Sequence, residues 1–212
     1  MATFSGILED VEYEILTGAF RPRERLVEKE VMARFNINRN TVRKILKELQ
    51  IKRLITHYPN RGAIVSELSE QEVRDIYALR MLLERHACDL VIKNITPQKL
   101  KEVKKISQQF NRAAKEKDFK RMVKANIEFH NTITKMCGNA ALSEMIEQWR
   151  TRCHLISHSH WRQPGVIKKS IEEHQKILQA LETRSAAELK SVNKKHTEVS
   201  LKSYLKRIEG FG

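Results

Sequence analysis

Four polar side chains fall where helical periodicity predicts buried apolar residues. Asn126 and His130 are four residues apart in the segment KANIEFHNTI, residues 124–133, so both lie on the stripe that a helix would turn toward its core. His174 and His196 lie on the apolar stripes of two later helical segments. A buried imidazole needs a hydrogen-bond or metal partner. Three imidazoles and an amide oxygen from three helices therefore predict a divalent metal site that suits Zn²⁺, Ni²⁺ or Mn²⁺.

Two alternative roles for such a metal stay open. It could serve a metal-dependent hydrolase or lyase, because three histidines and an oxygen ligand also suit those enzymes. It could instead be purely structural. Glu128 and Glu173 are acidic neighbours of the candidate ligands in sequence, but the helical pattern turns both of them off the buried stripes. No general base is therefore evident, and we expect a protein that is not an enzyme.

The N-terminal part of the chain has the pattern of a winged helix-turn-helix. Apolar residues at helical spacing predict one helix that ends at Gly18 and a shorter one that ends near Phe35. Asn38 is a good N-cap for a third helix, whose N-terminal end is basic and polar. Two β-prone pieces, Leu54–His57 and Ala63–Val65, flank turn residues and predict the hairpin known as a wing.

The distribution of charge favours a nucleic-acid partner for this part of the chain. The formal net charge of the protein is +14. Residues 34–61 contain eight Lys or Arg and a single acidic residue, Glu48, so about half of the excess lies in about an eighth of the length. A concentrated positive charge on a helix-turn-helix indicates binding to a polyanion such as DNA.

From residue 69 onward the pattern is helical throughout. Apolar stripes predict six helices, over residues 69–94, 97–115, 118–136, 139–157, 166–182 and 184–208. Seven Gly and four Pro in 212 residues leave few breaks between them. We therefore expect a mainly α protein with two domains. A winged helix-turn-helix DNA-binding domain would cover residues 1–68, and an all-α bundle would cover residues 69–212.

Composition narrows the class of protein further. Hydrophobic residues make up 41% and charged residues 31% of the chain, as in soluble globular proteins. Three separated cysteines without a CxxC motif favour a reducing compartment over a disulfide framework or a thiolate zinc site. No segment has the apolar length of a signal peptide or a membrane span. We expect a cytoplasmic protein with no membrane partner.

The ordered set of motifs resembles the GntR family of bacterial transcription regulators, in the FadR subfamily with an FCD effector domain. The pieces that carry the resemblance, over nearly the whole chain, are ILTGAFRPRERLVEKEVMARFNINRNTVRKILKEL, NRGAIV, YALRMLLERHA, IEFHNTI, CGNAAL, EEHQKILQAL and KKHTEVS. The resemblance implies a homodimer that binds a short palindromic operator, most often as a repressor. By position, the implied DNA contacts are Lys29, Asn38, Arg39, Asn40, Thr41, Arg43, Arg61 and Gly62.

Two positions in the N-terminal domain depart from the family pattern. Lys29 stands where several relatives have Arg, so the bidentate base contact that a guanidinium makes is not expected there. Arg23 replaces the Gly that often follows Pro22.

The resemblance also implies a metal in the helical domain, with an organic-acid or sugar-acid effector bound at or near it. The implied ligands are Asn126, His130, His174 and His196, and Asn126 stands where Asp is commoner. Without that carboxylate, we expect weaker metal binding and a more positive site that favours an anionic effector. The implied effector contact is Arg80, which is spaced to pair with Glu84. Arg150 and Arg152 flank the stripe of their helix, so either could reach inward to the effector or stay on the helix surface in a salt bridge or in solvent.

Overall fold

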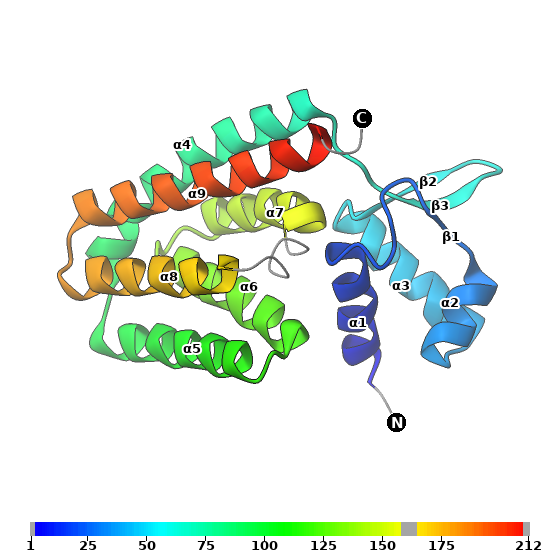
Figure 1. Ribbon diagram of the computed structural model, residues 1–212, viewed down its shortest axis with the longest axis horizontal. Coiled ribbons are helices and arrows are strands. Elements are labelled where there is room, and N and C mark those ends of the chain that lie inside the picture. The colour runs from blue at the N-terminus through cyan, green and yellow to red at the C-terminus, as the bar shows by residue number, and fades with distance from the viewer. Residues whose placement is uncertain (1–2, 158–164, 210–212) are drawn as a thin grey trace. The chain divides into compact units, whose positions relative to one another are not determined.

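The computed structural model describes residues 3–157 and 165–209, which fold into two compact units (Figure 1). The division falls between Ser69 and Glu70, and residues 151–157 are counted with the first unit. Within the described ranges, no helix has both the length and the apolar character needed to cross a bilayer.

The first unit consists of three helices and a small sheet. The helices are α1 (Phe4–Leu16), α2 (Glu28–Phe35) and α3 (Arg39–Ile51). The strands are β1 (Arg25–Leu26), β2 (Ile55–Tyr58) and β3 (Gly62–Val65), and they pair antiparallel in the order β1-β3-β2.

Local residue types explain how α2 passes into α3. Asn36 adopts the left-handed conformation, with φ of 50°, and its N–H bonds back to the carbonyl of Met32, so α2 ends there. The side chain of Asn38 then accepts a hydrogen bond from the backbone N–H of Thr41 at 2.9 Å and starts α3. The apolar face of α3 is fully buried in the first unit by Val42, Ile45 and Leu49.

A tight turn joins β2 to β3 and forms the wing. The N–H of Arg61 donates to the carbonyl of Tyr58 at 3.2 Å, which closes a four-residue turn with Pro59 at its second position. Asn60 follows with φ of +62°, the sign that a type II turn requires at its third position. Gly62 is also left-handed, with φ of +78°, so a side chain there would be strained.

In the part of the chain that the structure describes, the second unit is a bundle of six helices, of which α7 has its last residues counted with the first unit. They are α4 (Glu70–Asn94), α5 (Pro97–Lys115), α6 (Phe119–Lys135), α7 (Ala140–Ser157), α8 (Val166–Glu182) and α9 (Ala186–Glu209). α4 and α9 pack side by side, α5 and α6 form a hairpin, and α8 packs against both α5 and α9 (Figure 1). The apolar core between them includes Val91, Val103, Phe129, Ile146, Ile177 and Leu181.

The predicted fold class is confirmed, and the six helices of the bundle end within two residues of the predicted bounds. Gly18 follows α1 in the left-handed conformation, as expected of a residue that ends a helix. The sequence pattern did not reveal β1, because a strand of two residues has no periodicity to detect. That strand places Arg25 opposite Ile64 of the wing.

The conformation of Arg23 generates a prediction about stability. Its φ is +67°, a region that costs a residue with a Cβ roughly 1–2 kcal/mol. Its backbone N–H bond to the carbonyl of Val65 does not need the side chain, which is 80% exposed and paired only with Glu67. Arg23→Gly should therefore raise the free energy of unfolding by roughly 0.5–1 kcal/mol, after the extra freedom of Gly in the unfolded chain is deducted.

Urea denaturation measures this change, and Arg21→Gly is the matched control. Arg21 is exposed and is not among the residues with positive φ, so its replacement by Gly should destabilise the protein by about 0.5–1 kcal/mol. Equal destabilisation by both changes would contradict the assignment of strain to Arg23.

Candidate DNA-binding surface and buried polar site

Two arginines on α3, the second helix of the helix-turn-helix, share one carboxylate of α2. The Nε of Arg43 donates to Oε1 of Glu28 at 3.1 Å, and the Nε of Arg39 lies 3.4 Å from Oε2 of the same residue. The arginine side chains are 57% and 64% exposed. Ion pairs this exposed add little stability. Their effect is to hold the two guanidinium groups beside each other on the surface.

The other predicted contacts of the helix-turn-helix fall into two groups. Asn38 and Thr41 bond to each other at the start of α3, through the Thr41 N–H at 2.9 Å and the Thr41 hydroxyl at 3.1 Å, so the amide oxygen of Asn38 already caps the helix. Asn40 and Lys29 are exposed on α3 and α2. The capping pair positions the helix, and the exposed pair is accessible to a partner.

The tip of the wing carries the remaining predicted DNA contacts. Arg61 is exposed beside Gly62, where the turn between β2 and β3 closes. The guanidinium of Arg25 lies close to Gly62, with its Nε 3.6 Å from where a Cβ of residue 62 would stand. Sequence reasoning missed Arg25, although it lies in the basic segment RPRERL.

The predicted metal ligands meet inside the helical bundle. The Nε2 of His174, which is fully buried, lies 3.0 Å from Oδ1 of Asn126. The rings of His130 and His196 are stacked with their centroids 4.9 Å apart, and His130 lies edge-on to His174 at 5.3 Å. We call these four residues the histidine cluster. α6, α8 and α9 each contribute to it, as the apolar stripes predicted.

One expectation about this region is wrong. Glu173 was expected to point off the buried stripe, yet its Oε2 bonds to Nδ1 of His196 at 2.7 Å and its side chain is only 16% exposed. The partner is on α9, one helix further along the chain, so the periodicity of α8 could not reveal the contact. Glu128 is exposed, as expected.

The chemistry of the histidine cluster fits a divalent metal. Burial and the neighbouring His196 lower the pKa of His174 to about 3, so its imidazole is neutral, the form that binds metals. Glu173 holds Nδ1 of His196, the outer carboxylate contact typical of metal-binding histidines. Nε2 of His174 and Oδ1 of Asn126, which are hydrogen-bonded at 3.0 Å, lie close enough that both would bind one ion in place of that hydrogen bond. The described residues nevertheless contain no ready-made group of three His, Cys, Asp or Glu at metal-holding distances, so side chains must rotate to bind one.

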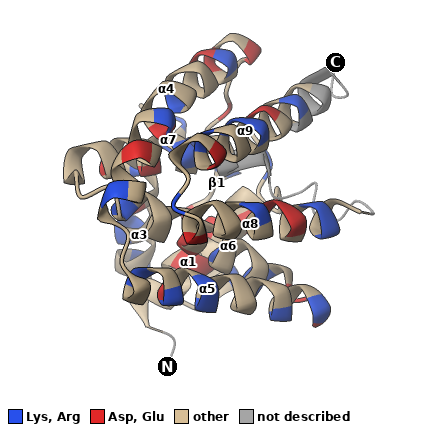
Figure 2. Ribbon diagram, turned by 90° about the vertical axis from the view of Figure 1, so that its left-hand side faces the viewer, with Lys and Arg blue, Asp and Glu red and all other residues tan. Residues whose placement is uncertain are grey.

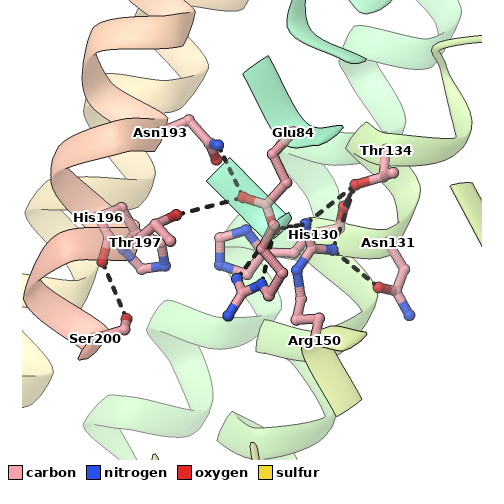
Figure 3. A network of polar contacts seen from close by, with 10 residues as sticks. Glu84, His130, Asn131, Thr134, Arg150, Asn193, His196, Thr197 and Ser200 are labelled. Carbon is pink, nitrogen blue, oxygen red and sulfur yellow. Dashed lines mark hydrogen bonds and ion pairs between the residues drawn. The ribbon is translucent and has the colours of Figure 1, made fainter. Parts of the chain in front are cut away.

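A second polar network surrounds Glu84 (Figure 3). Arg80 donates to its Oε1 from Nε at 3.1 Å and Nη2 at 3.0 Å, and Arg150 donates to the same oxygen from Nη2 at 3.2 Å. The other oxygen accepts from Asn193 at 2.9 Å and from Thr197 at 3.3 Å. The three charged side chains are at most 7% exposed. This Glu84 network therefore joins α4, α7 and α9 through one carboxylate.

A small cavity adjoins the Glu84 network and one member of the histidine cluster, His130. Its volume is about 30 Å³, and Glu84, His130, Arg150 and Asn193 are among its lining residues. That volume suits a single water molecule. An organic acid would therefore need the surrounding helices to move apart.

The predicted effector arginines separate into two places. Arg80 and Arg150 come together at Glu84, and the i,i+4 pair of Arg80 and Glu84 is the one that the sequence predicted. Arg152 is half-buried and lies among the residues counted with the first unit. Sequence spacing could not separate them, because Arg150 and Arg152 flank the same stripe of α7.

Comparisons with known proteins agree with this architecture. The model of the family described as "Bacterial regulatory proteins, gntR family" matches residues 4–65, and that of the "FCD domain" matches residues 75–199. A winged helix-turn-helix followed by an FCD domain defines a bacterial transcriptional regulator that binds DNA. The chain belongs to the GntR family, in the FadR-like subfamily with an FCD domain.

Similar proteins are regulators as well. The HTH-type transcriptional regulator McbR of Escherichia coli is 25% identical over 82% of this chain and 80% of its own length. The Nta operon transcriptional regulator of Aminobacter aminovorans is 25% identical over 90% of this chain and 89% of its own length. The gluconate operon transcriptional repressor of Bacillus subtilis is 27% identical over 59% of this chain and 51% of its own. The solved structure of E. coli McbR/YncC covers 98% of this chain and all of its own, with a TM-score of 0.80 and 22% identity.

The buried carboxylate of Glu84 generates a prediction about acid stability. Burial alone would raise its pKa, but Arg80, Arg150 and the hydrogen bond from Asn193 lower it from 4.5 to about 2. A carboxylate whose pKa is lower in the folded protein than in the unfolded chain stabilises the fold at pH values above the unfolded-state pKa. That stability is lost as the pH falls through the folded-state pKa, here between about pH 5 and pH 2. The shift corresponds to roughly 3 kcal/mol.

Glu84→Gln should cost roughly 3–5 kcal/mol at pH 7, because it leaves two buried guanidinium groups without a counter-charge. The difference from wild type should shrink steadily as the pH falls below about 5. Urea denaturation at a series of pH values measures both curves. Glu70→Gln is the control, since its pair with Arg74 is half-exposed and should contribute almost nothing. If the difference in free energy of unfolding between wild type and Glu84→Gln stays constant down to pH 3, ionised Glu84 is not the source of this stability.

Proposed function

We propose that this protein is a ligand-responsive transcriptional repressor that reads its operator with α3 and the wing. The observation that carries this proposal is the pair of exposed arginines, Arg39 and Arg43, at the N-terminal end of α3. That end of a recognition helix enters the major groove in helix-turn-helix proteins. Arginine binds the O6 and N7 atoms of guanine in a bidentate manner. Arg61 and Gly62 at the wing tip would approach the adjacent minor groove.

DNA would replace Glu28 as the partner of both arginines. In the DNA-free protein, the carboxylate of Glu28 neutralises part of their charge. A base edge or phosphate at the right position offers a second acceptor for the same N–H groups. Lys29, Asn38, Asn40 and Thr41 would add contacts around this pair, and the capped start of α3 fixes the direction in which they point.

The histidine cluster would hold a divalent metal through His130, His174, His196 and the amide oxygen of Asn126. The neutral imidazole of His174 and the outer contact from Glu173 to His196 support this proposal. Zn²⁺, Ni²⁺ and Mn²⁺ all suit such ligands. When bound, the ion would supply positive charge for an anionic ligand. Asn126 brings no negative charge, so more of that positive charge would remain for the ligand.

The effector would be a small organic acid or sugar acid that binds between the metal site and the Glu84 network. Arg150 lines the small cavity that adjoins Glu84 and His130, and Arg80 pairs with the same Glu84, so the cavity would be the starting volume. Guanidinium groups bind carboxylates well. That one similar protein represses a gluconate operon supports a sugar acid. The regulators among its relatives favour this function over a metal-dependent hydrolase.

The protein would act as a homodimer on a palindromic operator in the cytoplasm. Leu82 on α4 and Met145 on α7 support a protein partner for the helical unit, because their side chains are 70% and 46% exposed. Two winged units on one palindrome would give each half-site its own α3. Effector binding would change operator affinity by a coupling free energy of about 1–3 kcal/mol.

Substitution of both α3 arginines tests the DNA-binding surface. Arg39→Ala with Arg43→Ala should weaken binding to the promoter DNA adjoining the gene by at least about thirtyfold, because two base or phosphate contacts are lost. The slope of log affinity against log salt should become shallower by about 1.8. Electrophoretic shift at several salt concentrations measures both. Arg74→Ala, on the exposed face of α4, is the control, and wild-type binding by the double variant would show that α3 is not the reading helix.

Metal analysis of the purified protein tests the histidine cluster. His174→Ala should lose the bound metal, whereas His86→Ala, an exposed histidine on α4, should retain it. Asn126→Asp should tighten metal binding by about tenfold, because one unit of charge close to the ion is added. Chelator competition gives the affinities. The same metal content in wild type and His174→Ala would exclude this site, and metal loss in Asn126→Asp would exclude Asn126 as a ligand.

A further inference from the structure

The positive charge of this protein is concentrated in two segments. Residues 34–61 account for half of the net charge of +14. Residues 99–124 contain ten Lys or Arg and three acidic residues, an excess of seven, which is the other half. The remaining residues are balanced. The second segment is far from the helix-turn-helix in sequence and belongs to the second unit, so DNA reading by α3 does not account for it.

The structure places this second segment on one helical hairpin. It covers α5, the short turn after it and the first part of α6, and Lys and Arg appear blue along α5 in Figure 2. On α5, the exposed cations repeat at helical spacing along a single stripe, Lys101, Lys105, Arg112 and Lys115. Lys117 continues the row in the turn. Among the described residues, none of these five forms an ion pair.

This arrangement costs the helix stability. α5 has no acidic residue in its first turn, where negative charge would suit the helix dipole, and carries Lys99 there instead. Lys101 and Lys105 are like charges at i,i+4, a spacing that destabilises an isolated helix. Lys104 is the neighbour that does find a partner, Glu182 of α8, at 2.6 Å. Arg112 and Lys115 lie in the last turn, where cations suit the helix dipole, so the cost falls on the N-terminal half of the stripe. Unpaired cations that destabilise this half indicate a negatively charged partner.

We propose that the α5–α6 hairpin is a second DNA-binding surface, which contacts the phosphates of duplex DNA independently of base sequence. Its contacts would add to those of the helix-turn-helix. The cations of this stripe are separated by roughly 4.5–10.5 Å along the helix axis, from the 1.5 Å rise per residue, and Lys side chains are long enough to adjust to phosphates. Lysine is a compact point charge without the fixed geometry of arginine, so it neutralises phosphate without selecting a base.

The side chains of this surface favour DNA over a membrane or a protein partner. Among the residues that the structure describes, the large exposed apolar ones are Phe4, Ile51, Tyr58, Leu82 and Met145, and none of these lies between residues 97 and 128. A membrane-bound helix would need apolar groups beside its cations to enter the lipid. A protein interface would be expected to centre on aromatic anchors. A purely ionic stripe instead matches the phosphate backbone, where charge neutralisation dominates affinity.

Charge removal on α5 in the full-length protein tests the proposal. The triple variant Lys101→Gln, Lys105→Gln, Lys115→Gln keeps good helix formers at exposed positions. Its affinity for a random-sequence duplex of about 40 base pairs should fall by about tenfold at about 100 mM salt. The slope of log affinity against log salt should become shallower by about two to three, because up to three counterions fewer are released.

A matched triple variant separates local contact from net charge. This control variant removes three positive charges from exposed positions of α8, by Lys168→Gln, Lys169→Gln and Lys176→Gln. It should leave the duplex affinity and its salt dependence nearly unchanged. Equal effects of the two triple variants would overturn the proposal, as would no effect of either. Vesicles that contain anionic lipid form a further arm. If the α5 variant loses vesicle binding but keeps duplex affinity, the surface is a membrane contact and the proposal is wrong.

The result of the α5 charge-removal experiment can be interpreted whether or not α3 reads the operator as proposed. The Arg39, Arg43 double alanine variant should retain weak binding to random-sequence DNA, and the α5 substitutions should remove that remainder. If the double variant binds its promoter normally while the α5 variant loses random-sequence affinity, the role of α3 is wrong and the hairpin proposal stands. If α3 behaves as expected and the α5 variant is unchanged, only the hairpin proposal fails.

Discussion

The helical unit depends on a single buried carboxylate. Two guanidinium groups, from Arg80 and Arg150, are removed from water almost completely, and an uncompensated buried charge costs several kcal/mol. Glu84 makes their burial possible because its two oxygens accept hydrogen bonds from side chains on three helices. The burial of the Glu84 carboxylate depends in turn on the same donors. The positions of α4, α7 and α9 are therefore coupled: each helix is held where its donor can reach the same group.

The histidine cluster shares α9 with the Glu84 network, and α6 also links the two buried sites. On α6, His130 belongs to the cluster, and its carbonyl accepts a hydrogen bond from the hydroxyl of Thr134, which in turn accepts from Arg150. On α9, His196 is adjacent to Thr197, which donates to Glu84 (Figure 3). A rigid helix moves both residues together, so displacement of His196 alters the hydrogen bonds of Glu84. This arrangement gives a bound ligand a physical route to the packing of the bundle.

Local features of this protein could be predicted from sequence, whereas only some of its long-range contacts could. The helices followed from apolar stripes, and the start of α3 followed from Asn38, because both depend on residues within one or two turns. The meeting of Asn126 with His174 also followed, since buried polar groups on separate stripes have few other places to go. The contacts of Glu28 with two arginines and of Glu173 with His196 were missed, because each acid selects its partner from another helix.

The choice between arginine and lysine follows the chemistry expected of the two basic segments. Five of the eight cations in residues 34–61 are arginine, whereas eight of the ten in residues 99–124 are lysine. A guanidinium presents a planar set of donors, so it binds best in one orientation and to an acceptor of matching geometry. Glu28 already imposes such an orientation on Arg39 and Arg43. The ammonium group of lysine, on its flexible stem, attracts a nearby negative charge with little dependence on orientation. The two proposed modes, selective reading and non-selective attraction, would favour different cations, and arginine predominates in the first segment whereas lysine predominates in the second.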